Sequence, residues 1–330
     1  MMLAMAQSAD AGVQSAHGVL LVRPVHFGYN SETAASNRFQ HLAQWPDTAA
    51  RARSEFDALA AALAAAGVDV CVVEDSSEPV KPDAVFPNNW VSFHRDGTIV
   101  LYPMQAPNRR AERRIDVIEA VERRLQFQRR RLLDLSGNEQ HGRMLEGTGS
   151  LVLDHVHKIA YACCSVRTEA SLVREWSQRL GYDPLLFDAR GAGGVAIYHT
   201  NVMLSIGSRW AVVCSEAIDM AGRQRVLQRL AASGRDIIEI PVSAMASFAC
   251  NILELRARTA SGDQQSVLAL SEQARSALQD AGAGAHGGAG AWERLVAHVD
   301  RVVVAAIPTI ERVGGGSVRC MLAEVPTALA

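Results

Sequence analysis

The stretch GSLVLDHVHKIAYACCSVRTEASLVREWSQRLGYDPLLFD, residues 149–188, contains the unit from which the fold follows. Two short apolar runs, 149–155 and 158–165, flank a polar turn and predict a β-hairpin. Residues 168–181 place apolar side chains at helical spacing and end at a glycine, which favours a helix. Residues 184–188 form one more apolar run. The stretch therefore predicts the order strand, strand, helix, strand.

The same order recurs along the chain with a period of about 50 to 60 residues, which marks a fold of repeated units. The expected segments of the other units are 18–24, 49–67 and 68–75; 84–94, 96–104, 109–125 and 130–136; 201–207, 209–215, 223–234 and 236–241; and 249–257, 266–271, helical material to about 300, and 301–308. The Gly/Ala-rich segment 280–291 interrupts the last helical region and is expected to be a mobile surface loop.

The first unit lacks one strand of its hairpin, and one strand, 319–325, remains at the end of the chain. Pairing 319–325 beside 18–24 would complete the first unit and leave no unpaired sheet edge. We therefore expect an α/β ring of five ββαβ units around a central cavity. An open doubly wound sheet would need single strands to alternate with helices, whereas hairpins precede the helices here. Residues 1–17 are expected to be a disordered N-terminus and 18–330 a single domain.

Composition excludes several classes of function. The net charge of −2 gives no basic field for nucleic acid. No apolar stretch reaches the roughly 18 residues of a membrane span, and the opening residues lack the features of a signal peptide. Six cysteines without a CxxC pair indicate reduced thiols and a cytoplasmic protein, and the cysteines and histidines lack zinc-ligand spacing. No metal or organic cofactor is implied.

Reactive or polar side chains lie at matching points, at the end of the first strand of a unit that points toward the centre of the ring. These residues are Asp83 to Asn89 in the second unit, Glu146 in the third, His199 and Asn201 in the fourth, and Cys320 on the closing strand. A lone cysteine in an apolar run is usually a packing residue. Four such sites at equivalent positions in a ring are hard to explain by packing, so we expect them to converge on the central cavity.

With these motifs in view, the chain resembles the guanidine-modifying, or amidinotransferase, superfamily of pentein-fold enzymes. Arginine deiminases of this superfamily carry F-x-R-D, E-G-G-D, H-x-D and a Gly-rich segment ending R-C-M. In the same order, this chain has Phe86–Asn89, Glu146–Gly149, His199–Asn201 and Gly316–Met321. The set FPNNW, EGTGSLVLDH, HTNVMLSIG and SFACN most resembles the citrulline ureidase branch. The resemblance covers nearly the whole chain and implies a pentein fold, a five-bladed α/β propeller.

The resemblance also implies catalytic roles. Cys320 would be the nucleophile of a covalent intermediate, and the glycines before it would let a loop open and close over it. An ordinary thiol is mostly protonated at neutral pH, so His199 would act as general acid and base. Glu146 would accept hydrogen bonds from the N–H groups of the substrate and orient its central carbon.

Two departures from the arginine deiminase pattern bear on the substrate. Asn89 and Asn201 stand where that pattern has aspartates that bind a guanidinium group. A buried guanidinium needs its charge compensated, whereas a neutral ureido oxygen needs a donor, which an asparagine amide supplies. We therefore expect hydrolysis of citrulline to ornithine, ammonia and carbon dioxide, with arginine as the second candidate substrate.

The amino-acid end of the substrate needs partners of its own. By resemblance, Asp83 would contact the α-amino group, Arg167 the α-carboxylate, and Arg109 or its neighbour Arg110 the carboxylate side as well. A solvated basic helix start is the alternative for Arg109. The polar stretch 27–40 is either a lid or pocket rim or an ordered surface loop. The expected substrate-binding residues are Asp83, Asn88, Asn89, Asn201, Arg167, Arg109 and Phe27.

Three alternatives stay open at this stage. Cys250 in FACN is the rival nucleophile, although it is expected to be buried inside a strand. A pentein can also be a non-catalytic binding module, a class with no reason to assemble Glu, His and Cys in one pocket. An amidinotransferase would need a second amine as acceptor. The expected partner is a small amino acid, citrulline or an arginine derivative, with no nucleic acid or membrane, and a homo-oligomer is compatible with the sequence.

Overall fold

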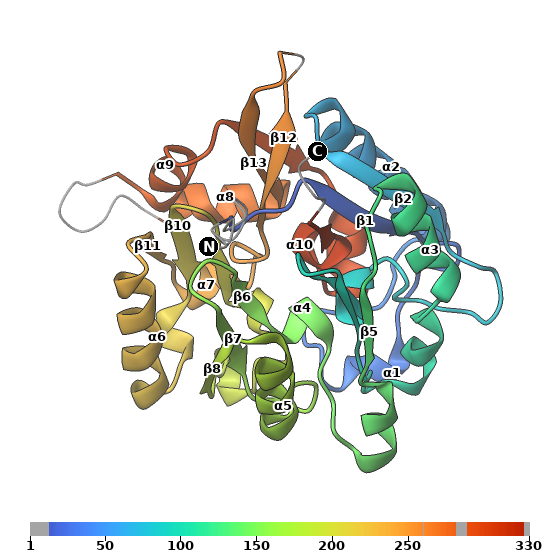
Figure 1. The fold of residues 1–330 in the computed structure, drawn as a ribbon, viewed down its shortest axis with the longest axis horizontal. Helices are drawn as coiled ribbons and strands as arrows, with labels where there is room; N and C mark the ends of the chain where they lie inside the picture. The colour runs from blue at the N-terminus through green and yellow to red at the C-terminus, as the bar shows by residue number, and fades with distance from the viewer. Residues whose placement is uncertain (1–12, 260, 282–288, 327–330) are drawn as a thin grey trace, which may run out of the picture.

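The computed structural model describes residues 13–259, 261–281 and 289–326. Within them, five three-stranded sheets surround a central axis, as Figure 1 shows. Each sheet has one antiparallel and one parallel strand pair, and a helix connects the two parallel strands. The repeating unit of hairpin, helix and strand, and the ring of five such units that it predicted, are therefore confirmed.

The elements follow the chain in five units and a closing segment. The first unit contains β1 (Gly18–Arg23), α1 (Ser31–Ala34), α2 (Thr48–Ala65) and β2 (Asp69–Glu74). The second contains η1 (Pro87–Asn89), β3 (Val91–Phe93), β4 (Thr98–Leu101), η2 (Pro107–Glu112), α3 (Ile115–Arg124) and β5 (Arg131–Asp134). The third contains η3 (Ser136–His141), α4 (Gly147–Ser150), β6 (Val152–Asp154), β7 (Ile159–Cys163), α5 (Ala170–Leu180) and β8 (Asp183–Phe187).

The remaining elements complete the ring. The fourth unit contains η4 (Ala192–Gly194), η5 (Thr200–Val202), β9 (Leu204–Ile206), β10 (Trp210–Val213), η6 (Ser215–Ala217), α6 (Met220–Ala232) and β11 (Asp236–Glu239). The fifth contains α7 (Val242–Met245), β12 (Leu253–Arg258), β13 (Gln264–Ser271), α8 (Glu272–Asp280), α9 (Ala291–Val296) and β14 (Arg301–Ala305). The closing segment contains η7 (Ile310–Gly314), α10 (Val318–Met321) and β15 (Ala323–Val325).

The ring closes through the pairing expected from the unmatched strand. β15 pairs antiparallel with β1, so that Gly18 lies opposite Val325 and Leu20 opposite Ala323. β1 in turn pairs parallel with β2 along its whole length. The last strand of the chain thus completes the first sheet, and it carries the residues just before it to the centre of the ring.

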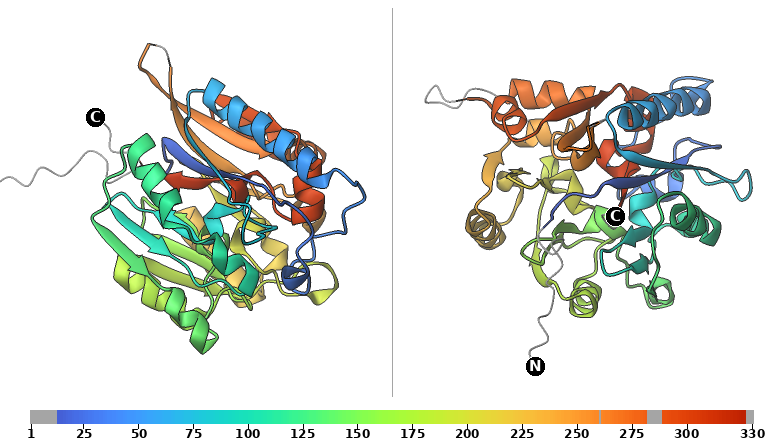
Figure 2. Two further views of the ribbon diagram at one scale, coloured as in Figure 1. Left: turned by 90° about the vertical axis from the view of Figure 1, so that its right-hand side faces the viewer. Right: turned by 45° about the horizontal axis from the view of Figure 1, so that its top comes forward.

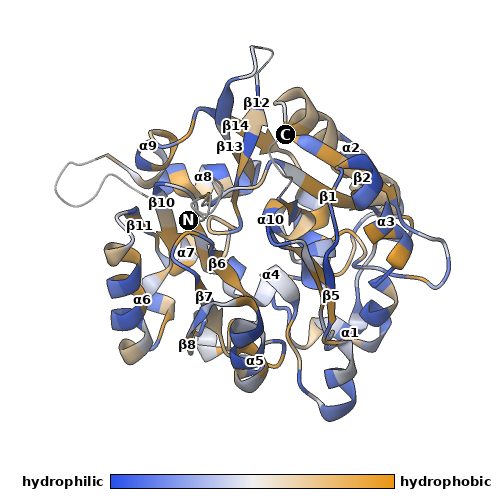
Figure 3. Ribbon diagram, in the orientation of Figure 1, coloured by the Kyte–Doolittle hydropathy of each residue, from blue (hydrophilic) through white to orange (hydrophobic). Residues whose placement is uncertain are grey.

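The connecting helices cover the outside of the ring (Figure 2). In α2 the buried side chains include Ala52, Phe56, Leu59 and Leu63, which share one face because they are three or four residues apart. This face packs against β2 and against β14 of the neighbouring unit. Burial of each large apolar side chain stabilises the fold by about 1.5–3 kcal/mol. Figure 3 shows the complementary hydrophilic residues on the outer side of α6.

The prediction of a single helix over 109–125 is wrong. The structure has the 3-10 helix η2 and then α3, because Arg113 and Arg114 have extended backbone between them. The side chain of Arg113 donates to the carbonyl oxygen of Tyr102 (3.1 Å) and pairs with Glu139, which anchors the break. The break allows η2 to turn Arg109 toward the interior of the ring while α3 runs along the outside.

Short helical turns, rather than strand ends, carry the polar motifs. η1, α4, η5 and α10 each come just before a first strand, and α4 packs against η1 and η5 while α10 packs against η1. Figure 1 shows α4 and α10 near the centre of the ring. Cys320 therefore lies in the helical turn α10, and the expected strand over 319–325 is limited to Ala323–Val325.

The domain begins before residue 18, the boundary predicted from the sequence. Residues 14–17 are buried, and the backbone of Ala16 bridges to Leu255 of β12. The Gln14 amide donates to the carbonyl oxygen of Leu153 (2.8 Å), and the Ser15 hydroxyl donates to Glu254 (2.7 Å). Residues 1–12, and 282–288 of the expected mobile loop, lie outside the described residues. Within the described part, no helix is both long and apolar enough to cross a membrane.

Candidate active site

Glu146 is fully buried immediately before α4 and is surrounded by cations and donors. Its Oε2 accepts from His199 Nε2 (2.8 Å) and from Arg167 (3.4 Å), and its Oε1 accepts from the backbone N–H of Gln105 (3.0 Å). Burial alone would raise the pKa of this carboxyl, but Arg167, His199 and Arg109 together hold the pKa well below its usual range. Glu146 is therefore ionised.

His199 is buried beside it and is neutral at rest. Burial lowers its pKa to about 4, although Glu146 acts in the opposite direction. Since the ionised carboxylate can only accept, the neutral ring carries its proton on Nε2 and leaves Nδ1 as an acceptor. A Cβ atom at position 149 would lie 2.7 Å from Nδ1 and 2.5 Å from Asn89 Nδ2. Only glycine fits at 149, because the backbone packs directly against the His199 ring and the Asn89 amide.

The thiol of Cys320 lies among asparagine amides. Its Sγ is 3.2 Å from Asn251 Nδ2 and 3.6 Å from Asn201 Nδ2. The backbone N–H of Cys320 donates to Asn251 Oδ1 (3.3 Å), so that one buried amide contacts both ends of the residue. Burial raises the pKa of the thiol, while the hydrogen bond from Asn251 lowers it in part. The Cys320 side chain is therefore a protonated thiol at neutral pH.

Asn251 was assigned no role from the sequence. It is the last residue of SFACN and precedes β12, just as Asn201 precedes β9 and Asn89 precedes β3. Its matching position in the fifth unit was a signal that could have identified it. Cys250, beside it, is buried as expected but lies in a turn before β12 rather than in a strand.

Arg109 lies between Glu146 and two further acids, Glu112 and Asp83. Its Nε and Nη2 donate to Glu112 (2.8 and 2.9 Å), its Nη1 donates to Asn89 Oδ1 (2.9 Å), and Asp83 lies 3.7 Å away. Burial raises the pKa of Glu112 to about 7 despite this pairing. Arg109 is therefore an interior residue and not part of a solvated helix start, whereas Arg110 is partly exposed and contacts Met104 and Glu139.

The polar stretch 27–40 is ordered and borders the site. Asn30 donates to Asp83 Oδ2 (2.7 Å), and the Ser36 hydroxyl accepts from Arg167 Nη2 (2.6 Å). The Asn37 amide donates to the carbonyl oxygen of Gly314 (3.2 Å) at the start of the triple glycine. The stretch thus joins the two expected substrate-binding side chains Asp83 and Arg167 to the segment that precedes Cys320.

The triple glycine is buried and closely packed, in contrast to the flexible loop expected from its sequence. Gly315 has a φ of +64°, and a Cβ atom there would lie 2.7 Å from the Asn37 amide. A Cβ at Gly316 would lie 2.9 Å from the ring of Phe86, and one at Gly314 would lie 3.1 Å from Phe27. Glycine is required here because the backbone passes directly over two aromatic rings.

Glu146, His199, Cys320 and their hydrogen-bond partners form one buried cluster. Every expected site residue lies in or against this cluster. His199 contacts Glu146, and Asn201, two residues further along the chain, contacts the Cys320 thiol. Asn88 is fully buried, and its Oδ1 accepts from Asn89 Nδ2 (3.0 Å). Four buried polar atoms around the cluster have no hydrogen-bond partner among the described residues: Asp83 Oδ1, Asn88 Nδ2, Gln40 Nε2 and Gln105 Oε1. The geometry is that of a closed, polar site.

The raised pKa of Cys320 makes a prediction about chemical modification. Iodoacetamide reacts with the thiolate, so alkylation of Cys320 should be slow at pH 7 and should accelerate only above pH 9.0, the ordinary thiol value. Mass spectrometry of the peptides that contain Cys320 and the partly exposed Cys164 gives each rate within the same protein. Rapid alkylation of Cys320 at pH 7 would mean that the thiol is activated before substrate arrives.

Comparison with known proteins supplies a family. A family model described as N,N dimethylarginine dimethylhydrolase, eukaryotic, matches residues 23–327. A search of curated proteins gives no match.

Solved structures give the fold. ArgZ, an arginine dihydrolase from the ornithine–ammonia cycle in cyanobacteria, superimposes with a TM-score of 0.67 at 14% identity. The match covers 95% of this chain but only 41% of ArgZ. The N-terminal domain of ArgZ bound to product has a TM-score of 0.66 at 15% identity, covering 93% of this chain and 97% of the domain. A dimethylarginine dimethylaminohydrolase, as an adduct with S-methyl-L-thiocitrulline, has a TM-score of 0.60 at 16% identity, covering 93% and 98%.

Proposed function

The chain belongs to the N,N-dimethylarginine dimethylhydrolase family of the pentein superfamily, and from this premise we propose that it hydrolyses the ureido group of citrulline through Cys320. At the coarser level the chain is a hydrolase of C–N bonds, of the guanidino-hydrolase type. The products of the proposed reaction are ornithine, ammonia and carbon dioxide.

One observation carries the choice of a neutral ureido group. The side chains that contact the thiol are amides, with Asn251 at 3.2 Å and Asn201 at 3.6 Å, and no carboxylate of the described residues is in hydrogen-bond contact with it. The carboxylate that contacts the histidine, Glu146, already faces two arginines. A guanidinium cation placed against Cys320 would meet uncharged groups, whereas a ureido oxygen can accept from their amide N–H groups.

The first half of the reaction forms a covalent intermediate. The proton of the Cys320 thiol passes to Nδ1 of neutral His199, and the thiolate attacks the ureido carbon. Glu146 holds the ring through Nε2 and stabilises the imidazolium that forms. The imidazolium then protonates the terminal nitrogen, which leaves as ammonia, while the carbon stays bonded to sulfur as an S-carbamoyl group.

The second half consumes water. His199, neutral again, removes a proton from water, which attacks the S-carbamoyl carbon, and the carbon–sulfur bond breaks. The proton returns to sulfur, and the carbamate of ornithine is released and loses carbon dioxide. The overall change is citrulline plus water to ornithine, ammonia and carbon dioxide, so no oxidant or further acceptor is needed.

The unpartnered polar atoms fit the other end of an amino acid. Asp83 uses only Oδ2 toward Asn30, so its Oδ1 is available to an α-ammonium group. Arg167 and Arg109 are the nearby cations for an α-carboxylate, and both face Glu146 in this structure. Glu146 Oε1 has one partner, the N–H of Gln105, and keeps a lone pair for a substrate N–H. Phe27 and Phe86 supply apolar surface beside the triple glycine.

Turnover of pure citrulline and pure arginine tests the proposal. We expect ornithine and ammonia in equal amounts from citrulline, measured by amino-acid chromatography and an ammonia assay. Efficient hydrolysis of arginine, with no hydrolysis of citrulline, would overturn the proposal. Methylated arginines, agmatine and N-succinylarginine belong in the same screen, because the family model is described by its dimethylarginine reaction.

A second candidate is an arginine dihydrolase. The structural neighbour ArgZ is described as one, and the same asparagine-lined site would carry arginine past a ureido intermediate. The two candidates differ in stoichiometry, since a dihydrolase releases two ammonia molecules for each ornithine formed from arginine. Accumulation of citrulline from arginine would instead indicate a deiminase.

Changing Asn89 and Asn201 to aspartate should shift the substrate preference. The double variant places two carboxylates where a guanidinium group would lie, and it removes two amide donors from a ureido oxygen. We expect the ratio of kcat/KM for arginine over citrulline to rise by about 100-fold. Steady-state kinetics on the two substrates gives this ratio directly.

Asn138→Asp is a matched control for this variant. Asn138 Oδ1 accepts from Arg143 (2.9 Å), as Asn89 Oδ1 accepts from Arg109, but it lies in η3 on the outer part of the third unit. The control should leave the substrate ratio unchanged. If the double variant keeps the same ratio as the wild type, these asparagines do not set the preference.

A further inference from the structure

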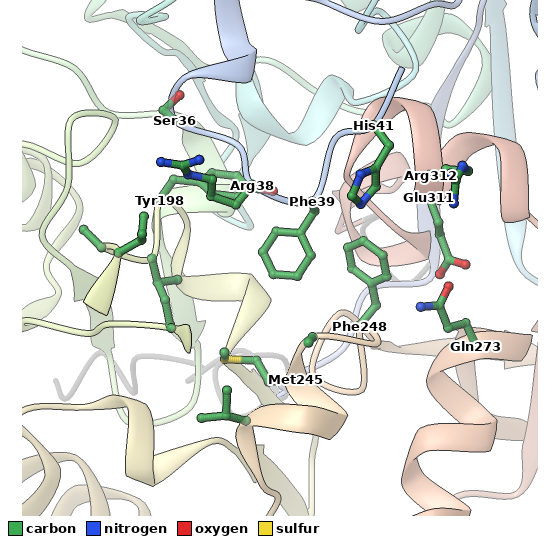
Figure 4. Close-up of a pocket in the computed structure, with 16 residues that line it drawn as sticks. Ser36, Arg38, Phe39, His41, Tyr198, Met245, Phe248, Gln273, Glu311 and Arg312 are labelled. Atoms are coloured by element: carbon green, nitrogen blue, oxygen red, sulfur yellow. The ribbon is translucent and has the colours of Figure 1, made fainter. Parts of the chain in front are cut away.

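A cavity of about 420 Å³ lies beside the cluster formed by Glu146, His199 and Cys320, and none of these three residues lines it. Figure 4 shows Phe39 and Phe248 in its centre, with Met245 below them. The two rings lie 5.1 Å apart, and Tyr198 packs edge-on against Phe39 at 6.2 Å. Its other apolar lining comes from Val195, Ile197 and Val242. Its volume is within the range of small-molecule sites, which runs from about 300 to 1,000 Å³.

The polar lining of this cavity includes two arginines and one histidine. Arg38, His41 and Arg312 line it and are exposed. Among the described residues, none makes a hydrogen bond or ion pair with their side chains. The one acid in the lining, Glu311, is buried and accepts from the Ser317 hydroxyl (2.7 Å), and burial raises its pKa to about 7. An anionic ligand would therefore meet free guanidinium groups.

The cavity is separated from the thiol by a wall of side chains. Neither Cys320 nor His199 lines it. Tyr198 forms part of the wall: its ring contacts the His199 ring on one side, with centroids 4.6 Å apart, and its hydroxyl donates to the carbonyl oxygen of Gly315 (2.9 Å). Glu311 forms another part of this wall, and its carboxylate accepts from the hydroxyl of Ser317, which follows the triple glycine. A ligand in the cavity would contact the same side chains that hold the triple glycine in place.

We propose that this cavity is a second ligand site, which binds a small organic anion with an aromatic or branched apolar body. The apolar body would pack between Phe39 and Phe248, and the anionic group would pair with Arg38 or Arg312 at the rim. Apolar walls with a few convergent charged groups are the usual composition of a small-molecule site. A zwitterion such as citrulline, with a polar side chain, matches this lining poorly. The proposal does not depend on which substrate Cys320 acts upon.

Binding of 8-anilino-1-naphthalenesulfonate, an aromatic anion that fluoresces in apolar surroundings, tests the site directly. We expect saturable binding to the folded protein, and displacement by 3-phenylpropionate but not by 3-phenylpropylamine, its cationic analogue. The double variant Arg38→Glu/Arg312→Glu should bind the probe at least 10-fold more weakly, because two attractions become repulsions. Ala246→Trp, at an exposed lining position, should also abolish binding by filling the cavity.

Two controls separate this site from nonspecific charge attraction and from the substrate site. Arg301→Glu changes an exposed arginine in β14 that is not part of the lining and should leave probe affinity unchanged. In Cys320→Ala, saturating citrulline should leave the probe bound. Absence of saturable binding, equal affinity in the double variant, or complete displacement by citrulline would each overturn the proposal, the last by assigning the cavity to the substrate itself. None of these readouts depends on turnover, and probe binding, displacement by 3-phenylpropionate and the double variant test the cavity even if the ureido assay fails.

Discussion

Replacing Cys320 by alanine should abolish citrulline hydrolysis while leaving the fold intact. Without sulfur no S-carbamoyl intermediate can form, and loss of a catalytic nucleophile lowers kcat by about 10⁴- to 10⁶-fold. The change removes one buried sulfur atom and leaves two asparagine amides without it, so the free energy of unfolding should fall by only about 1–3 kcal/mol. Ammonia release and a urea unfolding curve on the same preparation measure both quantities.

Cys250→Ala is the matched control for this change. Cys250 is also buried, and it lies next to Asn251, which contacts the Cys320 thiol. Its own thiol has a pKa raised well above the ordinary value by burial, so it should remain inert. The control should keep near-normal turnover. If Cys250→Ala lost activity and Cys320→Ala kept it, Cys250 would be the nucleophile instead of Cys320.

Glu146→Gln should damage both catalysis and stability. The Glu146 carboxylate compensates the positive charges of Arg167, at 3.4 Å, and Arg109, at 3.9 Å. Removal of one partner from a buried ion pair lowers the free energy of unfolding by about 3–5 kcal/mol. The glutamine amide would also place a donor or an uncharged acceptor against His199 Nε2, which disturbs the tautomer that leaves Nδ1 free. We expect kcat to fall by about 10³- to 10⁴-fold, by analogy with loss of the acid in a catalytic triad.

Glu112→Gln distinguishes this role from general charge balance. Glu112 pairs with Arg109 at 2.8 Å and is equally buried, but its hydrogen bonds go to Arg109 and not to His199. Burial raises its pKa to about 7, so it is already partly protonated at neutral pH and its amide is a smaller change. The Glu112 variant should retain most of its kcat. Equal losses of kcat in the two variants would mean that Glu146 acts only as a structural counter-ion.

Sequence periodicity was sufficient for the ring but not for the local structure of the site. The unmatched strand near residue 320 and the incomplete first unit predicted the pairing of β15 with β1, because an open sheet edge is unfavourable. Apolar residues around Cys320 also favoured a strand there. The helical turn is instead stabilised by tertiary contacts: the N–H of Cys320 bonds Ser317 and Asn251, and Asn251 is 69 residues away in the chain. The local sequence around Cys320 gives no information about a contact with a residue so far away in the chain.

The glycine run and the arginines show the same limit. Three consecutive glycines are typical of a flexible loop, but here they are buried because Phe86 and Asn37 approach the backbone too closely for any Cβ atom. The six-residue stretch from Arg109 to Arg114 gave no means of deciding which arginine faces inward. That choice depends on the break between η2 and α3, which is anchored by Tyr102 and Glu139 from elsewhere in the chain.

The most direct test is to identify the atom that becomes bonded to the substrate carbon. Citrulline labelled with radioactive carbon in its ureido group is mixed with the wild-type protein, quenched with acid during turnover and digested for mass spectrometry. We predict label on the peptide that contains Cys320, with a mass increase equal to citrulline minus ammonia. Ongoing turnover with no label on protein, or label on any other cysteine, would contradict attack by this thiol.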